Sequence, residues 1–464
     1  MSLPIRKFFD QEFANIKLND SRLSKRAITI GNNLIENPDS CIQTMMKTKN
    51  QARCAYDFFS NPKIKWHSLL ASHKENTIQR IIKTDEDYIY IIQDSTFYNY
   101  TKHKAKIDLG IIGKQGRQTQ FGFLQHTSFC ITFNDTVLGI LELDFIGYED
   151  DEKHSVHRNG FEKIASGRWR RFLSQNIKQL EGLECRKKII LLCDREADFF
   201  ELHDDLRHGE FKFIIRSKWN RYTGQSARAR KNKILDLLDQ EQSLGTVTIK
   251  VMNPGTHKQY NSDFNIKILK NILIPAIHRG AGHKQNSLKP VTMNIVEAND
   301  GNIKWVLLTN LSVDTIEDAI FVIESYKKRW HIESFHKVLK TAYNADKIYL
   351  HSSREAIQNL LTIINIAACQ TYSLIHQARV GHAVRADMTF STEEIVAANI
   401  FCNNKLIDKN QIPSLRDFYY IIAKLGGYKN FSNKHPPGIL TIYRGIKKLH
   451  NITEMYNIMM SIKT

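Results

Sequence analysis

The chain lacks the cysteine patterns that stabilise small metal-bound or disulfide-linked domains. Its seven cysteines are scattered and odd in number, and no CxxC pair occurs. Zinc ribbons need closely spaced thiolate pairs, and disulfide frameworks need an even set of cysteines. Neither class is therefore expected, and a reducing compartment suits the chain.

Long hydrophobic runs are also missing. The N-terminal residues lack the apolar region of a signal peptide. The most apolar stretch, residues 360–375, is interrupted by Asn365, Gln370 and Thr371, so it predicts a buried helix and no membrane span. With 464 residues, 42% hydrophobic content and no internal repeat, we expect a cytoplasmic globular protein of about two to four domains.

Acidic residues are in short supply relative to basic ones. The chain has 48 Asp and Glu against 66 Lys and Arg, a formal net charge of +18. Residues 216–290 alone carry fourteen cations and four acids. A membrane surface would favour a basic amphipathic helix, whereas this region is rich in strand and turn residues. We therefore expect a nucleic acid as the partner, because each neutralised phosphate releases counterions.

Residues 1–65 are predicted to be helical, and they contain a candidate anion site. Asn19, Asp20 and Ser21 can cap a helix whose first turns carry cations; these are Arg22, Lys25 and Arg26. Cations at a helix start oppose the helix dipole, so an external anion would relieve the conflict. The alternative is a merely charged surface.

From about residue 85 the pattern changes to strands. Strand and helix signals follow the order strand, strand, strand, helix, strand, helix, strand. They lie at residues 88–93, 121–133, 136–145, 161–180, 187–193, a short segment after 193, and 211–216. Asn134 and Asp135, between the second and third strands, predict a hairpin turn. This order predicts an α/β fold with a mixed sheet of the ribonuclease H kind. Residues 221–300 predict a β-rich insertion, and helices resume at about 317–342 and 353–378.

Three acids in this pattern predict a metal site. Asp94 directly follows the first predicted strand and Asp194 follows the fourth, so neighbouring strands would place them side by side. Glu333, on a later helix, can close the third side. Three converging carboxylates repel one another unless cations neutralise them. Oxygen ligands of this kind suit two Mg²⁺ or Mn²⁺ ions, which support phosphodiester displacement.

Each acid also has an ordinary interpretation. Asp94 can cap a turn, and Asp194 can belong to a surface ion-pair cluster. Glu196 and Asp198 compete with Asp194 for the role of ligand.

The segment 326–342 combines an apolar face with a charged face. Its apolar residues recur at helical spacing; they are Ile332, Phe335, Leu339 and Ala342. The opposite side carries one acid among groups that bind phosphate; it comprises Tyr326, Arg329, Glu333, Lys337 and Lys340. The alternative is a solvated helix face with ion pairs four residues apart.

Two motifs carry a resemblance to a known family. Cys193-Asp-Arg-Glu-Ala-Asp198 and Tyr326-x-x-Arg329-x-x-x-Glu333-x-x-x-x-x-x-Lys340 resemble the DDE transposases of bacterial insertion sequences, above all the IS-four family, to which the Tn-five transposase belongs. Segments 13–26 and 55–62 are similar to its end-recognition domain, and residues 425–428 to its dimerisation region. The resemblance implies a helical DNA-end-binding domain at 1–65, a ribonuclease H-like catalytic domain at 66–370, and a helical dimerisation domain at 371–464.

The resemblance also implies roles for individual residues. Asp94, Asp194 and Glu333 would hold the catalytic metal ions. Further residues would contact DNA; these are Tyr326, Arg329, Lys340, Lys337, His336, Arg216 and Lys218, besides Arg22, Lys25 and Arg26 in the N-terminal domain. Trp305 would stack on a base flipped out of the duplex, although its strand pattern alone favours a core tryptophan.

The implied activity is cut-and-paste transposition. A homodimer would bind the terminal inverted repeats of its element, cleave the ends through a DNA hairpin and join the 3′-OH ends to target DNA at the bacterial nucleoid. Two alternatives remain open: a catalytically inactive DNA-binding relative that acts as an inhibitor, and a metal-dependent DNA nuclease.

Overall fold

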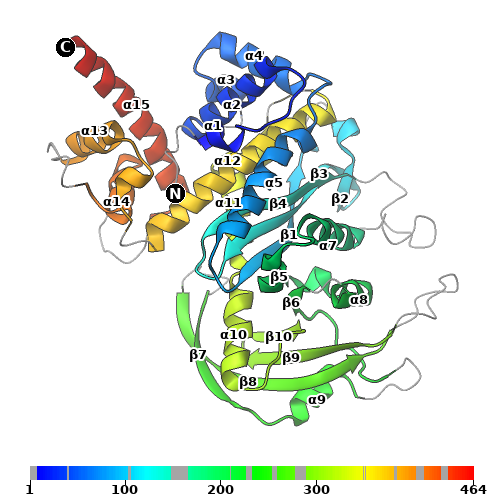
Figure 1. Cartoon of the computed structure of the whole chain (residues 1–464). Helices are drawn as coiled ribbons and strands as arrows, with labels where there is room; N and C mark the ends of the chain where they lie inside the picture. Colours follow the sequence, from blue (N-terminus) through cyan, green and yellow to red (C-terminus); the bar gives the residue numbers. More distant parts are fainter. Residues whose placement is uncertain are drawn as a thin grey trace.

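One mixed sheet runs through the centre of the molecule (Figure 1). The computed structural model describes residues 8–38, 41–102, 106–147, 166–208, 211–225, 232–252, 259–276, 289–348, 350, 352–380, 384–403, 412–429 and 437–463. The strand order is β2-β3-β1-β5-β6-β10-β9-β8-β7, with β4 also paired to β3. The strands are β1 (Ile89–Asn99), β2 (Ile111–Gln115), β3 (Gln118–Thr132), β4 (Val137–Ile146), β5 (Ile189–Cys193), β6 (Lys212–Arg216), β7 (Gly245–Met252), β8 (Gln259–Ile274), β9 (Val291–Asn299) and β10 (Lys304–Thr309).

The part of the sheet that positions the acids has the order expected of a ribonuclease H-like core. β4, β3 and β1 are antiparallel neighbours, whereas β5 and β6 run parallel to β1. The predicted α/β class is thus confirmed, as is the hairpin turn at Asn134 and Asp135 between β3 and β4. Asp135 has a φ of 64°, a left-handed conformation that aspartate tolerates in tight turns.

The first strand is longer than its sequence pattern suggested. β1 continues through Asp94 to Asn99, so the prediction that Asp94 follows the strand is wrong. Residues 95–99 stay extended because they pair with the long β3. The pairing of β1 with β5, however, ends at Ile92.

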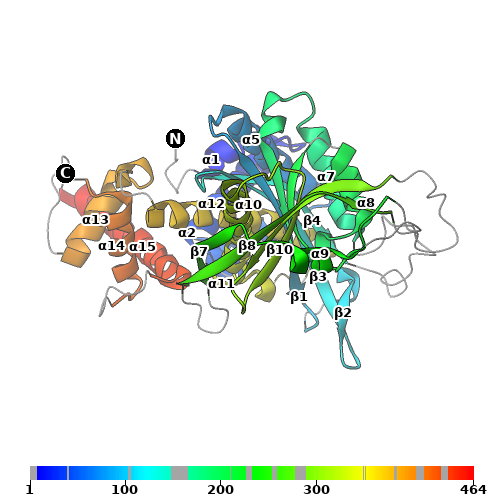
Figure 2. The same cartoon turned by 90° about the horizontal axis from the view of Figure 1, so that it is seen from below.

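Helices cover both faces of the sheet (Figure 2). Alternate β1 residues face opposite ways, so Ile89 and Ile91 pack with α7 and α8, whereas Tyr90 and Ile92 pack with α10, α11 and α12. The bounds are α7 (Gly167–Gln179), α8 (Phe200–His208), α10 (Ile316–Lys327), α11 (Trp330–Thr341) and α12 (Arg354–Val380). The first residues of the helix predicted at 161–180, up to 165, lie outside the described part.

The predicted helix at 317–342 is two helices. α10 ends at Lys327, and α11 begins at Trp330, after Lys328 and Arg329. Lys328 is the C-cap of α10, and its ammonium donates to Asp135 Oδ1 at 2.6 Å. The apolar face of α11 is buried as predicted; it comprises Ile332, Phe335, Leu339 and Ala342.

The region predicted as a β-rich insertion continues the main sheet. β9 pairs with β10, and β8 and β7 follow in antiparallel order. The short helix α9 (Ile234–Gln240) and Phe200 of α8 cover one side of these strands. The basic segment is therefore built onto the same sheet as the acids.

Helices flank the sheet at both ends of the chain (Figure 1). The N-terminal group comprises α1 (Phe8–Glu12), α2 (Ser21–Glu36), α3 (Ile42–Met45), α4 (Lys49–Phe59) and α5 (Trp66–Lys83); the C-terminal group comprises α13 (Thr392–Asn403), α14 (Leu415–Leu425) and α15 (Ile439–Lys463). Asp20 caps α2 as predicted. A Cβ at Gly426 would lie 1.8 Å from the Thr441 carbonyl oxygen, so glycine lets α14 and α15 approach closely. No helix in the described ranges has the length and apolarity to cross a bilayer.

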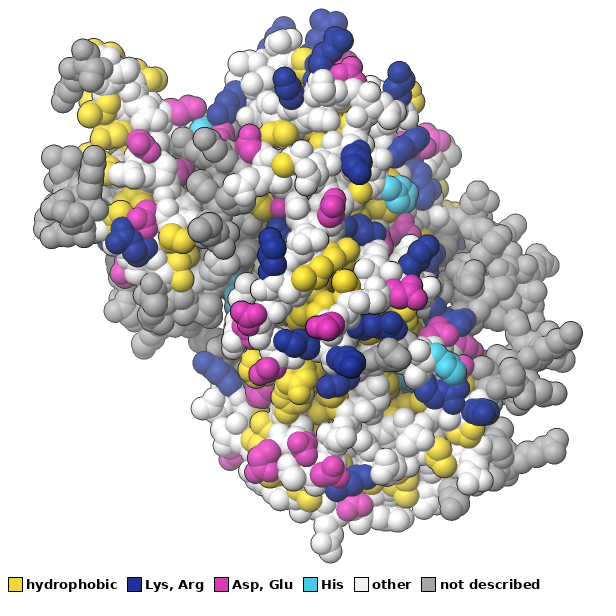
Figure 3. Space-filling model, in the orientation of Figure 1, with side chains coloured by type: hydrophobic (Ala, Val, Ile, Leu, Met, Phe, Trp, Pro, Cys, Tyr) yellow, Lys and Arg dark blue, Asp and Glu magenta, His cyan; other side chains and the backbone are white. Residues whose placement is uncertain are grey.

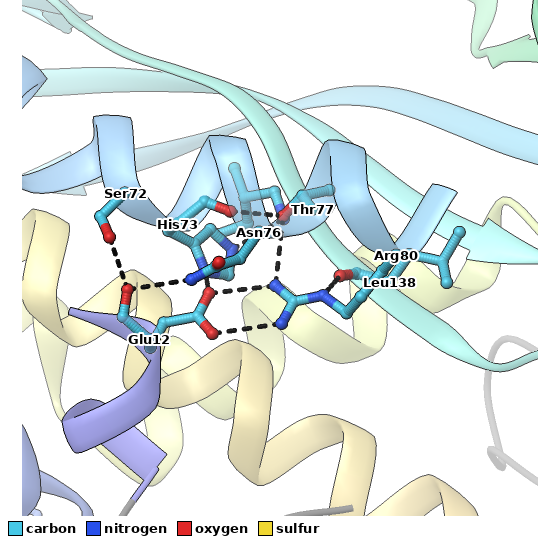
Figure 4. Close-up of polar contacts among 8 residues, drawn as sticks. Glu12, Ser72, His73, Asn76, Thr77, Arg80 and Leu138 are labelled. Atoms are coloured by element: carbon cyan, nitrogen blue, oxygen red, sulfur yellow. Dashed lines mark hydrogen bonds and ion pairs between the residues drawn. The ribbon is translucent and has the colours of Figure 1, made fainter. Parts of the chain in front are cut away.

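A buried ion cluster fixes α1 to α5 and to β4 (Figure 4). Glu12 accepts hydrogen bonds from His73 and from Arg80, whose Nη2 is 3.0 Å from Glu12 Oε1. His73 Nε2 accepts from the backbone of Ile140, and Arg80 donates to the carbonyl of Leu138 at 2.6 Å. Burial alone would raise the pKa of Glu12, but His73 and Arg80 lower it to about 2.

Removal of this carboxylate should destabilise the protein in a pH-dependent manner. We expect Glu12→Ala to lower the free energy of unfolding at pH 7 by about 3 kcal/mol, because it leaves Arg80 without its buried partner. The folded-state pKa is lowered, so the stabilisation is present above about pH 4.5 and is lost as pH falls towards 2. Denaturant unfolding at several pH values measures both effects. The exposed acid Asp57 provides the control, and an equal loss for Asp57→Ala would contradict the assignment.

Candidate active site

Asp94 and Asp194 share one edge of the sheet because β1 and β5 are parallel neighbours. Ile92 pairs with Leu192, and each aspartate comes two residues later along the chain: Asp94 within β1, and Asp194 directly after β5. Side chains alternate along a strand, so both acids face the side on which Ile92 and Leu192 pack against α11 and α12. Asp194 also caps a short 3-10 helix, η5 (Arg195–Ala197), by accepting from the backbone of Glu196 at 2.8 Å.

Glu333 reaches the same place from α11, and Arg329 connects it to Asp94. One guanidinium nitrogen of Arg329 donates to Asp94 Oδ2 at 3.2 Å, and the other donates to Glu333 Oε1. The Arg329 side chain is only 12% exposed, so solvent screens these ion pairs weakly. The structure thus brings Asp94 and Glu333 together around one cation.

The pKa of Asp94 reflects the charges of the other two acids. Burial raises the pKa of Asp94 to about 7; Arg329 opposes this shift, and the carboxylates of Asp194 and Glu333 add to it. Burial also raises the pKa of Asp194. A nearby cation would strongly stabilise the ionised form of these buried carboxylates. The ligand atoms are all carboxylate oxygens, which suit Mg²⁺ or Mn²⁺, and Asp94, Asp194 and Glu333 are the residues that would hold such ions.

A phenol and several arginines border the acids. Tyr326, at the end of α10, is buried, and the Arg329 guanidinium lies 5.9 Å from the centroid of its ring. Burial lowers the pKa of Arg216, contact with Tyr326 opposes that shift, and the charge of Arg195 adds to it. Arg216 and Arg329 therefore concentrate positive charge beside the carboxylates, which suits a phosphate ligand.

The other predicted DNA contacts of α11 differ in accessibility. Lys337 is exposed and Lys340 is half-buried, so both can reach a ligand. His336 is buried, and burial together with the charge of Lys340 lowers its pKa to about 3. His336 is therefore neutral at pH 7. At the N-terminal end, Arg22 and Lys25 are exposed on α2 and Arg26 is partly exposed.

Two tryptophans near Arg216 have contrasting environments. Trp305 is 8% exposed and packs between Phe264, at 5.7 Å between ring centroids, and Tyr326, at 6.2 Å. This burial agrees with the alternative of a core tryptophan. Trp219 is 51% exposed, and the Lys218 ammonium lies 5.1 Å from its ring.

Trp219 and Lys218 line a cleft together with Arg195, Arg216 and Lys304. Sequence reasoning missed Trp219, although an aromatic residue directly after a cation was a usable signal.

The two acids that compete with Asp194 have other partners. Asp198 is fully buried and accepts from Arg221, and from the backbone of Lys218 at 2.7 Å. Burial would raise its pKa, but His203 and Arg221 lower it. Glu196 is exposed and pairs with Arg168. Asp194 is thus the acid of this motif that remains for the site.

Arg168 is a supporting residue that the sequence did not reveal. It is buried at the start of α7, donates to the Ser95 hydroxyl at 3.0 Å, and pairs with Glu196. It therefore connects the residue after Asp94 with the loop after Asp194. The local sequence gave no sign of this contact, which joins residues 73 positions apart.

Two regions of the chain match known protein families. Residues 5–64 match the model of a transposase DNA-binding domain, and residues 170–370 match the model of a transposase DDE domain. Asp194 and Glu333 fall inside the second match, whereas Asp94 precedes it and is placed by the pairing of β1 with β5. A DDE domain implies a ribonuclease H-like core and a divalent metal ion. The chain therefore contains a region similar to transposase DNA-binding domains and a region similar to transposase DDE domains, which together support a DNA transposase.

Proposed function

We propose that this protein is a cut-and-paste transposase of the IS-four kind, similar to the transposase of Tn-five. It binds the terminal inverted repeats of its element at the bacterial nucleoid, cleaves the ends through a DNA hairpin and joins the 3′-OH ends to target DNA. The observation that supports this proposal best is the meeting of Asp94 and Glu333 on Arg329, beside Asp194.

At the scissile phosphate, the acids would bind the metal ions and Arg329 would bind the phosphate. Two Mg²⁺ or Mn²⁺ ions on Asp94, Asp194 and Glu333 would activate the attacking oxygen and stabilise the leaving oxygen. The Arg329 guanidinium has the planar fork that binds phosphate through two hydrogen bonds. The same guanidinium forms ion pairs with Asp94 and Glu333. Its pairing with the acids keeps it within reach of the same phosphate.

DNA contacts extend from this site along charged surfaces. Figure 3 shows Lys and Arg side chains gathered on the N-terminal helices, at the top of the view. Arg22 and Lys25 are exposed on the first turns of α2, within the matched DNA-binding domain. The remaining proposed contacts flank the acids; they are Tyr326, Lys337, Lys340, His336, Arg216 and Lys218. Contact by His336 would require α11 to shift, because the side chain is buried.

The end of α15 provides a surface for a second copy of the chain. Met455, Ile458, Met459 and Ile462 are 58–79% exposed. Their spacing of i, i+3, i+4 and i+7 puts them on one face of the helix. Figure 3 shows hydrophobic side chains along this projecting end, at the upper left. An exposed apolar stripe of this kind marks an interface, which supports the proposed homodimer.

Loss of Asp94 should separate binding from cleavage. With a DNA duplex containing the element end and Mn²⁺, we expect Asp94→Ala to reduce end cleavage by about 10³-fold or more, since metal ions supply several kcal/mol and each 1.36 kcal/mol is tenfold. Mobility shift should show end binding within about threefold of wild type, because phosphate contacts elsewhere supply most of the affinity.

Glu181→Ala, at an exposed acid outside the site, is the matched control and should cleave normally. Normal cleavage by Asp94→Ala would remove Asp94 from the site. Wild-type protein that binds ends without cutting them would favour the inactive relative. Cutting without hairpin or strand-transfer products would favour a nuclease.

The proposed base-stacking role of Trp305 can be tested against Trp219. A 2-aminopurine base near the cleavage site fluoresces when it leaves the duplex, and stacking on an indole quenches it. We expect Trp305→Leu to remove this quenching and to lower hairpin yield by about tenfold, because stacking contributes about 1–3 kcal/mol per base. Quenching that survives in Trp305→Leu but disappears in Trp219→Leu would transfer the role to Trp219.

Charge on the α15 stripe should break the dimer. We expect Ile458→Glu with Met459→Glu to weaken self-association by more than about 100-fold, because each buried side chain contributes about 1.5–3 kcal/mol. Analytical ultracentrifugation with and without element-end DNA measures this change. Asn457→Glu lies on the opposite side of the helix and should leave the dimer intact. A dimer that tolerates the double substitution would place the interface elsewhere.

A further inference from the structure

A second group of metal-ligand side chains lies on another side of α11. Asp135, His331 and His376 each offer one ligand atom, and these atoms lie within 4.8 Å of one another. Asp135 belongs to the β3–β4 turn, His331 to the first turn of α11, and His376 to α12. In the described part of the chain, no other set of three His, Cys, Asp or Glu residues is this close.

The two imidazoles are oriented as ligands. The Tyr372 hydroxyl is hydrogen-bonded to His331 Nδ1 at 2.8 Å, which leaves His331 Nε2 facing Asp135 Oδ1 at 3.2 Å. The ring of His376 lies 4.8 Å from the ring of His331. His376 Nε2 is buried and has no hydrogen-bond partner. A buried polar atom without a partner costs about 1–3 kcal/mol, and a bound ion would satisfy it.

We propose that Asp135, His331 and His376 bind one divalent transition-metal ion, of which Zn²⁺ is the best match. Two imidazoles and one carboxylate, with water in a fourth position, are a preferred Zn²⁺ ligand set, whereas Mg²⁺ favours oxygen ligands alone. Tyr372 orients the His331 ring, as outer partners of metal-bound histidines do. The ion joins the β3–β4 turn to α11 and α12, and thereby fixes the helix that carries Glu333. This site does not depend on the proposed function.

Lys328 is the competitor for the same carboxylate. Its ammonium lies 2.6 Å from Asp135 Oδ1. The metal ion must displace this ammonium or share the carboxylate with it. Replacement of Lys328 by an uncharged residue should therefore strengthen metal binding, whereas it would weaken a simple ion-pair network.

The test uses the full chain with Asp94→Asn and Asp194→Asn, so that the catalytic acids no longer hold metal. After chelator treatment, we expect calorimetry to show one Zn²⁺ per chain with micromolar or tighter affinity, and Co²⁺ to give the visible absorption of a low-coordinate site. His376→Gln should weaken Zn²⁺ binding by more than about 100-fold, beyond the effect of losing an outer partner. Lys328→Met should strengthen it by about tenfold, and Zn²⁺ should raise the melting temperature of the parent.

His208→Gln is the matched control, because this histidine is 71% exposed on α8 and lies outside the cluster. It should leave Zn²⁺ affinity and the Co²⁺ spectrum unchanged. Equal Zn²⁺ affinity in the parent and in His376→Gln would overturn the proposal. So would a Kd above about 100 μM in both the parent and Lys328→Met, a result that the folding of His376→Gln cannot affect.

Discussion

Repulsion among Asp94, Asp194 and Glu333 is the constraint on which the rest of this structure depends. Like charges at one sheet edge raise the free energy of the fold unless a cation lies between them. Arg329 supplies such a cation, because its guanidinium pairs with both Asp94 and Glu333. It lies directly before α11, one turn ahead of Glu333. Arg329 thus stabilises the arrangement of acids that metal ions would require.

Buried ion pairs elsewhere hold the elements that carry these acids. Arg221 and His203 keep Asp198 ionised inside the protein, which ties the loop after β5 to the segment after β6. Arg168 joins that loop to β1 through Ser95. Buried pairs contribute little net stability compared with apolar packing, but loss of one partner is costly. Their main effect here is to fix positions, because each pair joins two of the segments that bring Asp94 and Asp194 together.

Sequence periodicity predicted the α/β class, the α2 cap, the hairpin at Asn134 and the apolar face of α11, because each depends on neighbours close in the chain. It misjudged β1, whose extension past Asp94 is imposed by pairing with β3. It also joined α10 to α11, which the structure separates at Lys328 and Arg329. Arg168 was missed because its contact with Ser95 joins residues far apart in the chain. For the site, sequence could name Asp94, Asp194 and Glu333, but only the fold shows Arg329 between two of them.

The helix α11 faces two sites at once, and its geometry explains how. Residues two positions apart on a helix point about 200° away from each other. His331 therefore faces the β3–β4 turn and α12, whereas Glu333 faces the acids of β1 and β5. The two sides of α11 offer different ligands and would therefore bind different ions. Imidazoles on the His331 side select transition metals, whereas carboxylates on the Glu333 side select Mg²⁺-like ions. An ion on His331 would restrain the first turn of α11 and, with it, Arg329 and Glu333. The rigidity of the catalytic edge would then depend on a metal that takes no part in the chemistry.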